Sequence, residues 1–255
     1  MADRTYLFIT GTSRAGTTAM ADLMRSHEQI AMGRERYNSR YLADRHFPPE
    51  LFEKERFCVG FDPEDSHHNR MQPYYAELLP RFDSCLVVGD KIPSLSGDYT
   101  VLLEHFKLPK VVYMARDIFE VASSFEVKRQ AHLDDPANRK WNERRDYRAA
   151  VKEWNRALEN TLEYRDDVDL FVAPYVELFQ HDAFLTSLCA FAGVPVSDSM
   201  REHYAKGCRK RKRLERKREL ALTDEMRAYI EEHARFDLFD QVMELARCGV
   251  ERPHA

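Results

Sequence analysis

Near the N-terminus the chain reads Tyr6-Leu7-Phe8-Ile9-Thr10-Gly11-Thr12-Ser13-Arg14-Ala15-Gly16-Thr17-Thr18, where an apolar run leads into a loop with a glycine at each end. These glycines, Gly11 and Gly16, allow the backbone to wrap around an anion. The amides from Ala15 to Thr18 would lie at the positive end of the helix that follows. The segment therefore predicts a phosphate-binding loop between a strand and a helix.

The loop departs from the ATP-binding pattern at one position. Its spacing, G-x-x-x-x-G, matches that pattern, but Thr17 stands where a lysine would grip the β and γ phosphates of a nucleoside triphosphate. Arg14 supplies a cation two positions before Gly16 instead, and the hydroxyls of Thr17 and Thr18 can bind phosphate oxygens. The loop thus favours a different nucleotide. The alternative interpretation is a tight strand-to-helix turn with a threonine cap.

Composition indicates a globular protein without a membrane span. The chain has 255 residues, of which 44% are hydrophobic and 32% charged, and no apolar run approaches the roughly 18 residues of a spanning helix. The net charge of −4 does not favour nucleic acid or an anionic membrane as a partner, so any anion site must be local. Five cysteines without a C-x-x-C pair, and no export signal, predict a cytoplasmic location.

The hydrophobic pattern predicts an α/β fold with a central parallel β-sheet flanked by helices, in a single domain of residues 1–255. Helical spacing follows Gly16, Asp117 and Tyr147, and Thr223 is expected to cap a further helix. Almost wholly apolar runs suit strands that are covered on both faces. The expected strands are Tyr6–Thr10, Cys85–Gly89, Lys110–Met114 and Asp169–Ala173.

Two segments interrupt the alternation of strands and helices. Residues 47–82 are rich in proline and aromatic residues, and we expect them to form an insertion of helices and loops that shapes the mouth of the ligand site. Residues 206–218 carry nine basic residues and one acidic residue, which predicts a basic loop or the start of a helix. A solvated helix face is the plainer role for most of these charges.

A second motif follows the third expected strand. In Val111-Val112-Tyr113-Met114-Ala115-Arg116-Asp117 the strand ends at an arginine, and Ser124 lies two helical turns further on. A guanidinium and a hydroxyl so placed can converge on one phosphate group. Taken singly, Arg116 could instead pair with Asp117, and Ser124 could be an ordinary packing residue.

Together the two motifs resemble the PAPS-dependent sulfotransferases, in the bacterial or carbohydrate-type branch (PAPS is 3′-phosphoadenosine 5′-phosphosulfate). Ser13-Arg14-Ala15-Gly16-Thr17-Thr18 is similar to that family's 5′-phosphosulfate loop, and Arg116 with Ser124 to its 3′-phosphate motif. The stretch Tyr175–Leu178 resembles a further family segment. The resemblance implies a fold like that of the P-loop-containing nucleotide hydrolases, with PAPS as donor and PAP, adenosine 3′,5′-bisphosphate, as product.

Sulfuryl transfer needs a base for the acceptor and cations near the departing phosphate. Arg14 and Lys91 are the candidate cations, and Lys91 resembles the family's lysine at the end of a strand. Some members have a histidine base two residues later, where this chain has Pro93, so Glu35 is the candidate base by similarity to other members. A solvated Glu35, and a Lys91 paired with Asp90, are the plainer alternatives. The competing bases are His67, His68 and His105, and no spacing typical of a metal site accompanies them.

Other functions stay open at this point. The loop spacing would also suit a small-molecule kinase or NTPase that uses Mg-ATP, and the tract at 206–218 a non-catalytic nucleic-acid-binding protein. The resemblance also places a closing loop near this tract, over the 3′-phosphate. The acceptor could be a small molecule, a lipid or a glycan, and flat walls for it could come from Tyr37, Tyr41, Tyr74 and Tyr75.

Overall fold

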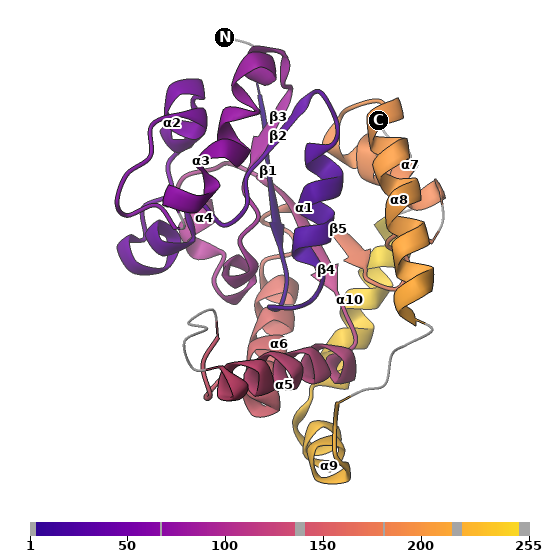
Figure 1. The fold of residues 1–255 in the computed structure, drawn as a ribbon. Helices are drawn as coiled ribbons and strands as arrows, with labels where there is room; N and C mark the ends of the chain where they lie inside the picture. Colours follow the sequence, from indigo (N-terminus) through magenta and orange to yellow (C-terminus); the bar gives the residue numbers. More distant parts are fainter. Residues whose placement is uncertain (1–3, 67, 136–140, 181, 216–220, 250–255) are drawn as a thin grey trace.

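The computed structural model describes residues 4–66, 68–135, 141–180, 182–215 and 221–249. A five-stranded sheet with the order β2-β3-β1-β4-β5 lies at its centre, and all strand pairs are parallel (Figure 1). This confirms the predicted α/β class. The strands are β1 (Thr5–Thr10), β2 (Ile30–Met32), β3 (Val87–Gly89), β4 (Lys110–Ala115) and β5 (Asp169–Pro174).

The sequence did not predict β2, which has only three residues. The helices are α1 (Thr17–Arg25), α2 (Lys54–Cys58), α3 (His68–Ala76), α4 (Thr100–Leu103), α5 (Ile118–Asp134), α6 (Tyr147–Glu163), α7 (Asp182–Ala192), α8 (Asp198–Glu215), α9 (Asp224–His233) and α10 (Phe236–Gly249). Short π or 3-10 turns are η1 (Arg40–Asp44), η2 (Pro49–Phe52), η3 (Leu79–Ser84) and η4 (Pro93–Gly97).

Side-chain caps fix where several helices begin. The Asp117 carboxylate accepts from the Glu120 amide at 3.1 Å at the start of α5, and Asp146 caps α6 in the same way. Thr223 Oγ1 accepts from the Met226 amide at 3.3 Å, so the predicted cap of α9 is confirmed. Among the described residues, none of these helices is long and apolar enough to cross a membrane.

Both faces of the sheet are buried. Along β1, Leu7 and Ile9 contact the core under α1, α7 and α8, whereas Phe8 points to the opposite face. On that opposite face, the segment from η1 to α4 covers β1 and β3, and the group of α5, α6, α9 and α10 covers β4 and β5 (Figure 1). Because successive side chains of a strand point to opposite faces and both faces are covered, nearly all of them are buried, which explains why the strand sequences are almost entirely apolar.

Residues 47–82 form part of the core on this second face. Phe47, Phe52, Phe57 and Phe82 are buried there, and successive rings of this series have centroids 5.4, 5.7 and 5.9 Å apart. The proline and aromatic residues, which predicted an insertion of helices and loops, form the short helices and turns η2, α2, α3 and η3 around a dense aromatic cluster.

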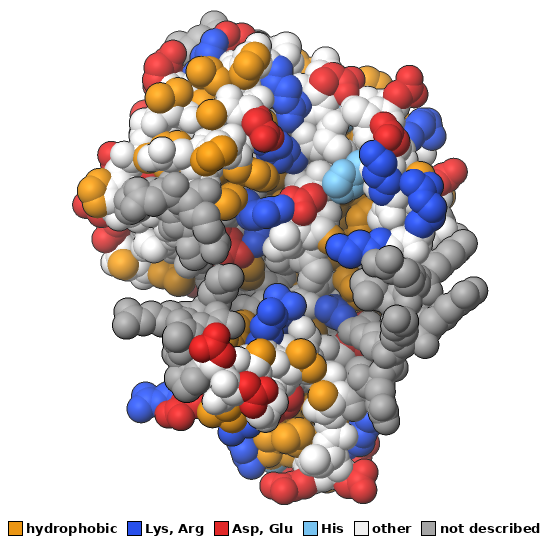
Figure 2. All heavy atoms as spheres, viewed as in Figure 1, with side chains coloured by type: hydrophobic (Ala, Val, Ile, Leu, Met, Phe, Trp, Pro, Cys, Tyr) orange, Lys and Arg blue, Asp and Glu red, His pale blue; other side chains and the backbone are white. Residues whose placement is uncertain are grey.

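The basic tract belongs to α8 as far as Glu215, so its described part is neither a loop nor the start of a helix. Lys206 pairs with Glu202 at 2.7 Å one turn earlier. Figure 2 shows basic side chains gathered over α8. Residues 216–218 lie outside the described residues.

Parallel strands bring four loops to one edge of the sheet, at their carboxyl ends. Backbone bonds tie these loops together: Gly33 N–H donates to Gly89 O at 2.8 Å, and Glu35 N–H donates to Lys91 O at 2.8 Å. Gly89 has to be a glycine, because a Cβ there would lie 1.6 Å from Leu7 O on β1. The loops after β1, β2, β3 and β4 therefore carry much of the candidate site, and Tyr175 joins them directly after β5.

Candidate active site

The two motifs of the sequence meet directly. Arg14 Nε donates to Ser124 Oγ at 3.0 Å, and Arg116 Nη1 donates to the backbone oxygen of Arg14. Arg14 itself has a φ of +73°, a left-handed conformation that turns its side chain toward α5. The loop after β1 and the start of α5 thus form one continuous surface.

Within the loop, the amides differ in their roles. The Ala15 amide donates to Thr12 O at 2.9 Å, and Ala15 is buried, so this predicted ligand amide closes the loop in this structure. The first helical bond of α1 runs from Met20 N–H to Gly16 O at 3.2 Å. The amides of Thr17 and Thr18 precede it and lie at the helix N-terminus, where an anion is favoured.

Gly16 has two reasons to be a glycine. Its φ of +98° lies in the left-handed region, and a Cβ there would lie 2.6 Å from the ring of Tyr175. Tyr175 belongs to the Tyr175–Leu178 stretch, and Arg116 Cζ lies over its ring at 4.0 Å from the centroid. The tyrosine thereby joins the loop to the arginine of the second motif.

Arg116 is nearly buried, with 8% of its surface exposed. Its Nε donates to Glu120 Oε2 at 2.9 Å, and its backbone oxygen accepts from Trp154 Nε1 at 2.9 Å. The ion pair with Asp117 that the sequence allowed is replaced by this pair with Glu120, since Asp117 caps α5. Arg116 is therefore held in a fixed orientation beside the loop.

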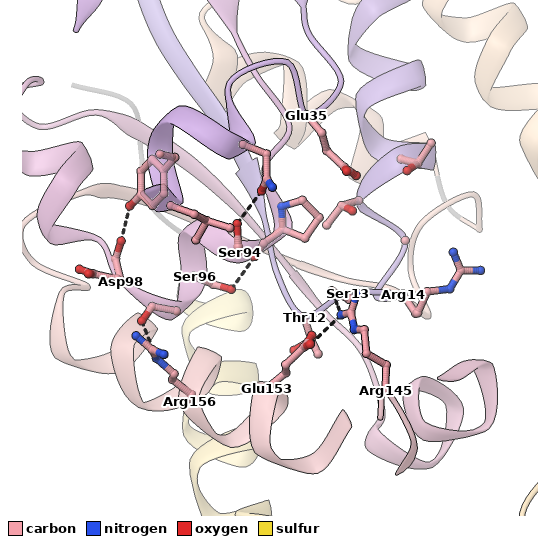
Figure 3. A pocket seen from close by; sticks show the side chains of 18 of the residues that line it. Thr12, Ser13, Arg14, Glu35, Ser94, Ser96, Asp98, Arg145, Glu153 and Arg156 are labelled. Carbon is pink, nitrogen blue, oxygen red and sulfur yellow. Dashed lines mark hydrogen bonds and ion pairs between the residues drawn. The ribbon is translucent and has the colours of Figure 1, made fainter. Parts of the chain in front are cut away.

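The loop is surrounded by positive charge. Burial lowers the pKa of the Arg14 guanidinium, and the positive charges of Arg116 and Arg145 lower it further. Arg145 Nη2 donates to Ser13 Oγ at 2.9 Å and to Glu153 Oε1 at 2.6 Å. Because like charges that repel one another are relieved by a bound anion, this cluster fits a phosphorylated ligand. Figure 3 shows Arg145 between Glu153 and the loop, with the Arg14 guanidinium pointing away from it.

Glu35 and Lys91 form an ion pair next to the loop. Lys91 Nζ bonds Glu35 Oε1; the lysine side chain is 2% exposed and that of the glutamate 33%. Glu35 has a φ of +61° and lines the cavity described below. The structure thus brings the candidate base and a candidate cation into contact, and Glu35 is neither fully solvated nor far from the site.

Asp90 binds the backbone of the two loops that carry the ion pair of Glu35 and Lys91. It is fully buried; Oδ2 accepts from the Tyr37 amide at 3.0 Å and Oδ1 from the Lys91 amide at 2.8 Å. Burial raises the pKa of Asp90 to about 7, despite these amides and the positive charge of Lys91. The plainer alternative, an ion pair between Asp90 and the Lys91 side chain, is not what the structure has, because Lys91 pairs with Glu35 and the Asp90 carboxylate binds backbone amides on two loops.

These groups surround a cavity of about 830 Å³ (Figure 3). At one end lie the loop, Arg116, Arg145 and Tyr175, and at the other end lie parts of 38–45 and 93–101. None of the described residues of 47–82 lines it, so this cavity gives no support to the mouth-shaping role predicted for that segment. The lining residues are Thr12, Ser13, Arg14, Gly16, Thr17, Thr18, Glu35, Asn38, Tyr41, Leu42, Arg45, Pro93, Ser94, Ser96, Gly97, Asp98, Val101, Arg116, Trp141, Arg145, Glu153, Arg156 and Tyr175. In Figure 2 basic side chains lie along the hollow above α5 and α6.

Most of the suggested aromatic walls lie elsewhere. Tyr37 and Tyr75 are fully buried in the core, whereas Tyr41 lines the cavity and its hydroxyl donates to Asp98 O. Tyr74 packs under the guanidinium of Arg25, 3.9 Å from the ring centroid.

The candidate histidines are not part of this cavity as far as it is described. His105 packs edge-on against His46, with 5.8 Å between ring centroids, and does not line the cavity. His67 lies outside the described residues, as does the side chain of His68. Over the described part of the chain, no group of three histidine, cysteine, aspartate or glutamate side chains is placed to hold a metal ion.

The chain is similar to known proteins in its sequence and in its fold. The model of the Sulfotransferase family matches residues 7–198. Among solved structures, the sulfotransferase from Alicyclobacillus acidocaldarius has 15% identity and a TM-score of 0.54, with 98% of this chain and 97% of that chain covered. The sulfotransferase domain from the curacin biosynthetic pathway has 19% identity and a TM-score of 0.52, with 80% of this chain and 79% of that chain covered.

A third solved structure, sulfotransferase STF9 from Mycobacterium avium, has 13% identity and a TM-score of 0.50, with 82% of this chain and 69% of that chain covered. At such identities these likenesses show the fold alone. A search of curated proteins gives no significant match.

Proposed function

The chain belongs to the sulfotransferase family, and we propose that it transfers a sulfuryl group from PAPS to a hydroxyl group of a small-molecule, lipid or glycan acceptor. The observation that carries this proposal is the contact between the two phosphate motifs. Arg14 bonds Ser124, and Arg116 bonds the backbone of Arg14, so one mononucleotide with a phosphate at each end could reach both motifs.

In the proposed arrangement the 5′-phosphosulfate lies against the loop. The amides of Thr17 and Thr18 and the charge of Arg14 support it there, at the N-terminus of α1. The 3′-phosphate is proposed to bind Arg116, which is nearly buried, and Ser124, and Arg14 contacts both of these residues. The positive charge around the loop, which lowers the pKa of Arg14, favours this anionic ligand.

Glu35 is the proposed base. Since Lys91 Nζ bonds Oε1, the other oxygen, Oε2, is the one that can accept the proton of an acceptor hydroxyl. The acceptor oxygen forms a new bond to sulfur, the bond from sulfur to the 5′-phosphate oxygen breaks, and PAP leaves with that electron pair. Lys91 and Arg14 are the cations proposed to stabilise the charge that develops on this oxygen.

The acceptor is proposed to enter at the end of the cavity formed by 38–45 and 93–101. This end has the hydroxyls of Ser94 and Ser96 and the amide of Asn38, beside the apolar surface of Leu42 and Val101. Three of the described cysteines, Cys58, Cys85 and Cys189, are buried free thiols. Free thiols support the proposal of a cytoplasmic enzyme.

Two other functions are weaker on particular observations. A kinase that uses Mg-ATP would need a lysine where Thr17 stands. A nucleic-acid-binding role would use α8, where Lys206 is already paired with Glu202. The described side chains of the basic tract at 206–218 do not line the cavity. The loop that the resemblance expects to close over the 3′-phosphate therefore has no support from these residues.

Thermal unfolding in the presence of three ligands tests the proposal. PAP, Mg-ATP and a mixed-sequence oligonucleotide are added in parallel, and the unfolding midpoint is recorded at increasing ligand concentration. A ligand that binds only the folded chain raises this midpoint as its concentration increases. We expect PAP to do so without a metal ion. Stabilisation by Mg-ATP alone, or by the oligonucleotide alone, would replace the proposal by one of the other two functions.

A further inference from the structure

Arg145 contacts the phosphate loop although no motif of the sequence includes it. It lies between α5 and α6, and its Nη2 donates to Ser13 Oγ at 2.9 Å across 132 residues of sequence. Ser13 belongs to the 5′ side of the proposed nucleotide site, and both residues line the cavity. A guanidinium therefore lies against the loop at Ser13, one residue before the arginine that bonds Ser124.

The guanidinium of Arg145 is held on several sides. Glu153 on α6 accepts a bond from Nη2 at 2.6 Å, and the ring of Trp141 lies 4.3 Å from Cζ. Trp141 Nε1 in turn donates to the backbone oxygen of Arg145 at 2.9 Å. Such support fixes one rotamer and reduces the entropy that the side chain would lose on binding a ligand. The arginine is still 33% exposed toward the cavity.

Charge balance gives the second reason to expect a ligand at this position. The loop lacks the lysine that usually follows its second glycine, and the Arg14 side chain is directed to Ser124. Arg145, from a different part of the chain, therefore places a second cation at the loop, next to Ser13, in addition to the charge proposed for Arg14. Burial, then the charge of Arg116 and then that of Arg145 lower the pKa of Arg14, so the two guanidinium groups are close enough to repel each other.

We propose that Arg145 is a further nucleotide-binding residue, which contacts the 5′-phosphosulfate of the donor from the Ser13 side of the loop. This inference rests on the proposed function, because it assigns one more ligand to the same donor. It predicts that Arg116 and Ser124 bind the 3′-phosphate, whereas Arg145 binds only the group at the 5′ position.

The test measures the dissociation constants of three nucleotides for the wild type and for Arg145→Gln by isothermal titration. The probes are PAP, adenosine 5′-phosphate and adenosine 3′-phosphate. Because a charged hydrogen bond is lost, the dissociation constants of PAP and adenosine 5′-phosphate should rise by about 10-fold or more. The dissociation constant of adenosine 3′-phosphate should change by less than about 2-fold, because this nucleotide has no phosphate at the 5′ position.

The control is Arg148→Gln, on the exposed start of α6. It removes the same charge away from the cavity and should change none of the three dissociation constants.

Each other outcome contradicts the inference. An equal loss of affinity for all three nucleotides would mean that Arg145 only supports the fold of the loop. A loss of affinity confined to ligands with a 3′-phosphate would place Arg145 at the 3′ end of the nucleotide site. Unchanged binding would remove it from the site. Should Arg145→Gln not fold, Arg145→Lys keeps the charge but not the planar fork, and the same 5′-specific loss, smaller in size, is expected. If the wild type itself does not bind PAP, the proposed function fails rather than this inference alone.

Discussion

Arg14 and Ser124 are 110 residues apart in sequence, and a hydrogen bond of 3.0 Å joins Arg14 Nε to Ser124 Oγ. The bond connects the loop after β1 to α5, and it does so at the surface of the cavity. It is the point at which the two ends of a bisphosphorylated nucleotide would be bound by neighbouring groups.

Ser124→Ala should therefore weaken PAP binding by about 10-fold, since a hydroxyl bonded to a charged partner is lost. The matched control is Ser123→Ala on the same helix. Ser123 Oγ accepts from the Ala221 amide at 2.9 Å, on a different face of α5, so its loss should lower stability and leave PAP affinity unchanged. Isothermal titration of both variants checks this, and equal PAP affinities in the two would contradict the assignment of Ser124.

Glu35→Gln should lower kcat by about 10²- to 10⁴-fold, the usual contribution of a general base. PAP affinity should stay within about 2-fold, because the proposed role of Glu35 concerns only the acceptor. Turnover is measured with PAPS and an acceptor found by screening hydroxyl compounds. Glu50→Gln, an exposed glutamate on η2 that does not line the cavity, is the control. A Glu35→Gln enzyme with the turnover of the wild type would remove Glu35 from the mechanism.

Asp90 should make stability fall as the pH rises from about 4 to about 7. Its pKa is about 7 in the folded chain, against 3.8 for an ordinary aspartate, so the folded state binds more protons than the unfolded state in this window. Above pH 7 the contribution is constant. We expect the free energy of unfolding of the wild type, minus that of Asp90→Asn, to decrease across this window in urea titrations. A difference that is independent of pH would show that the folded carboxyl has an ordinary pKa.

Gly16→Ala should destabilise the chain more than Gly193→Ala does. Both glycines have a positive φ, +98° and +78°, so an alanine is strained at either position. Only at Gly16 would the new Cβ also meet the Tyr175 ring, at 2.6 Å, while at Gly193 no atom lies within 4 Å. Gly193→Ala should cost about 1–2 kcal/mol of unfolding free energy. Gly16→Ala should cost more and should also weaken PAP binding, as thermal unfolding with and without PAP would show.

The sequence predicted the parts of the site that are local in the chain. The loop from Gly11 to Gly16 joins a strand directly to a helix, and Arg116 ends a strand, so their spacing is enough to predict them. The pair of Glu35 and Lys91 was also predicted as members of the site. Their contact was not, because it depends on β2 lying beside β3, and β2 has three residues without a pattern of its own.

Arg145 and the role of residues 47–82 could not be predicted in the same way. Arg145 reaches the loop only through the packing of α5 against α6, a contact that no spacing in the sequence records. Prolines and aromatic residues in 47–82 are typical of surface loops, yet here Phe52 and Phe57 pack with the ring of Tyr37 into a core. The position of Arg145 and the burial of the aromatic residues in 47–82 both depend on tertiary packing, which a local sequence pattern does not record.

The most direct test of the account compares the affinity of the wild-type chain for PAP and for adenosine 5′-phosphate, which differ only in the 3′-phosphate. If Arg116 and Ser124 bind that group, isothermal titration should give a dissociation constant for PAP that is lower by about 100-fold, the effect of two charged hydrogen bonds. Equal dissociation constants would show that the second motif binds no phosphate, and the account of the site would be wrong.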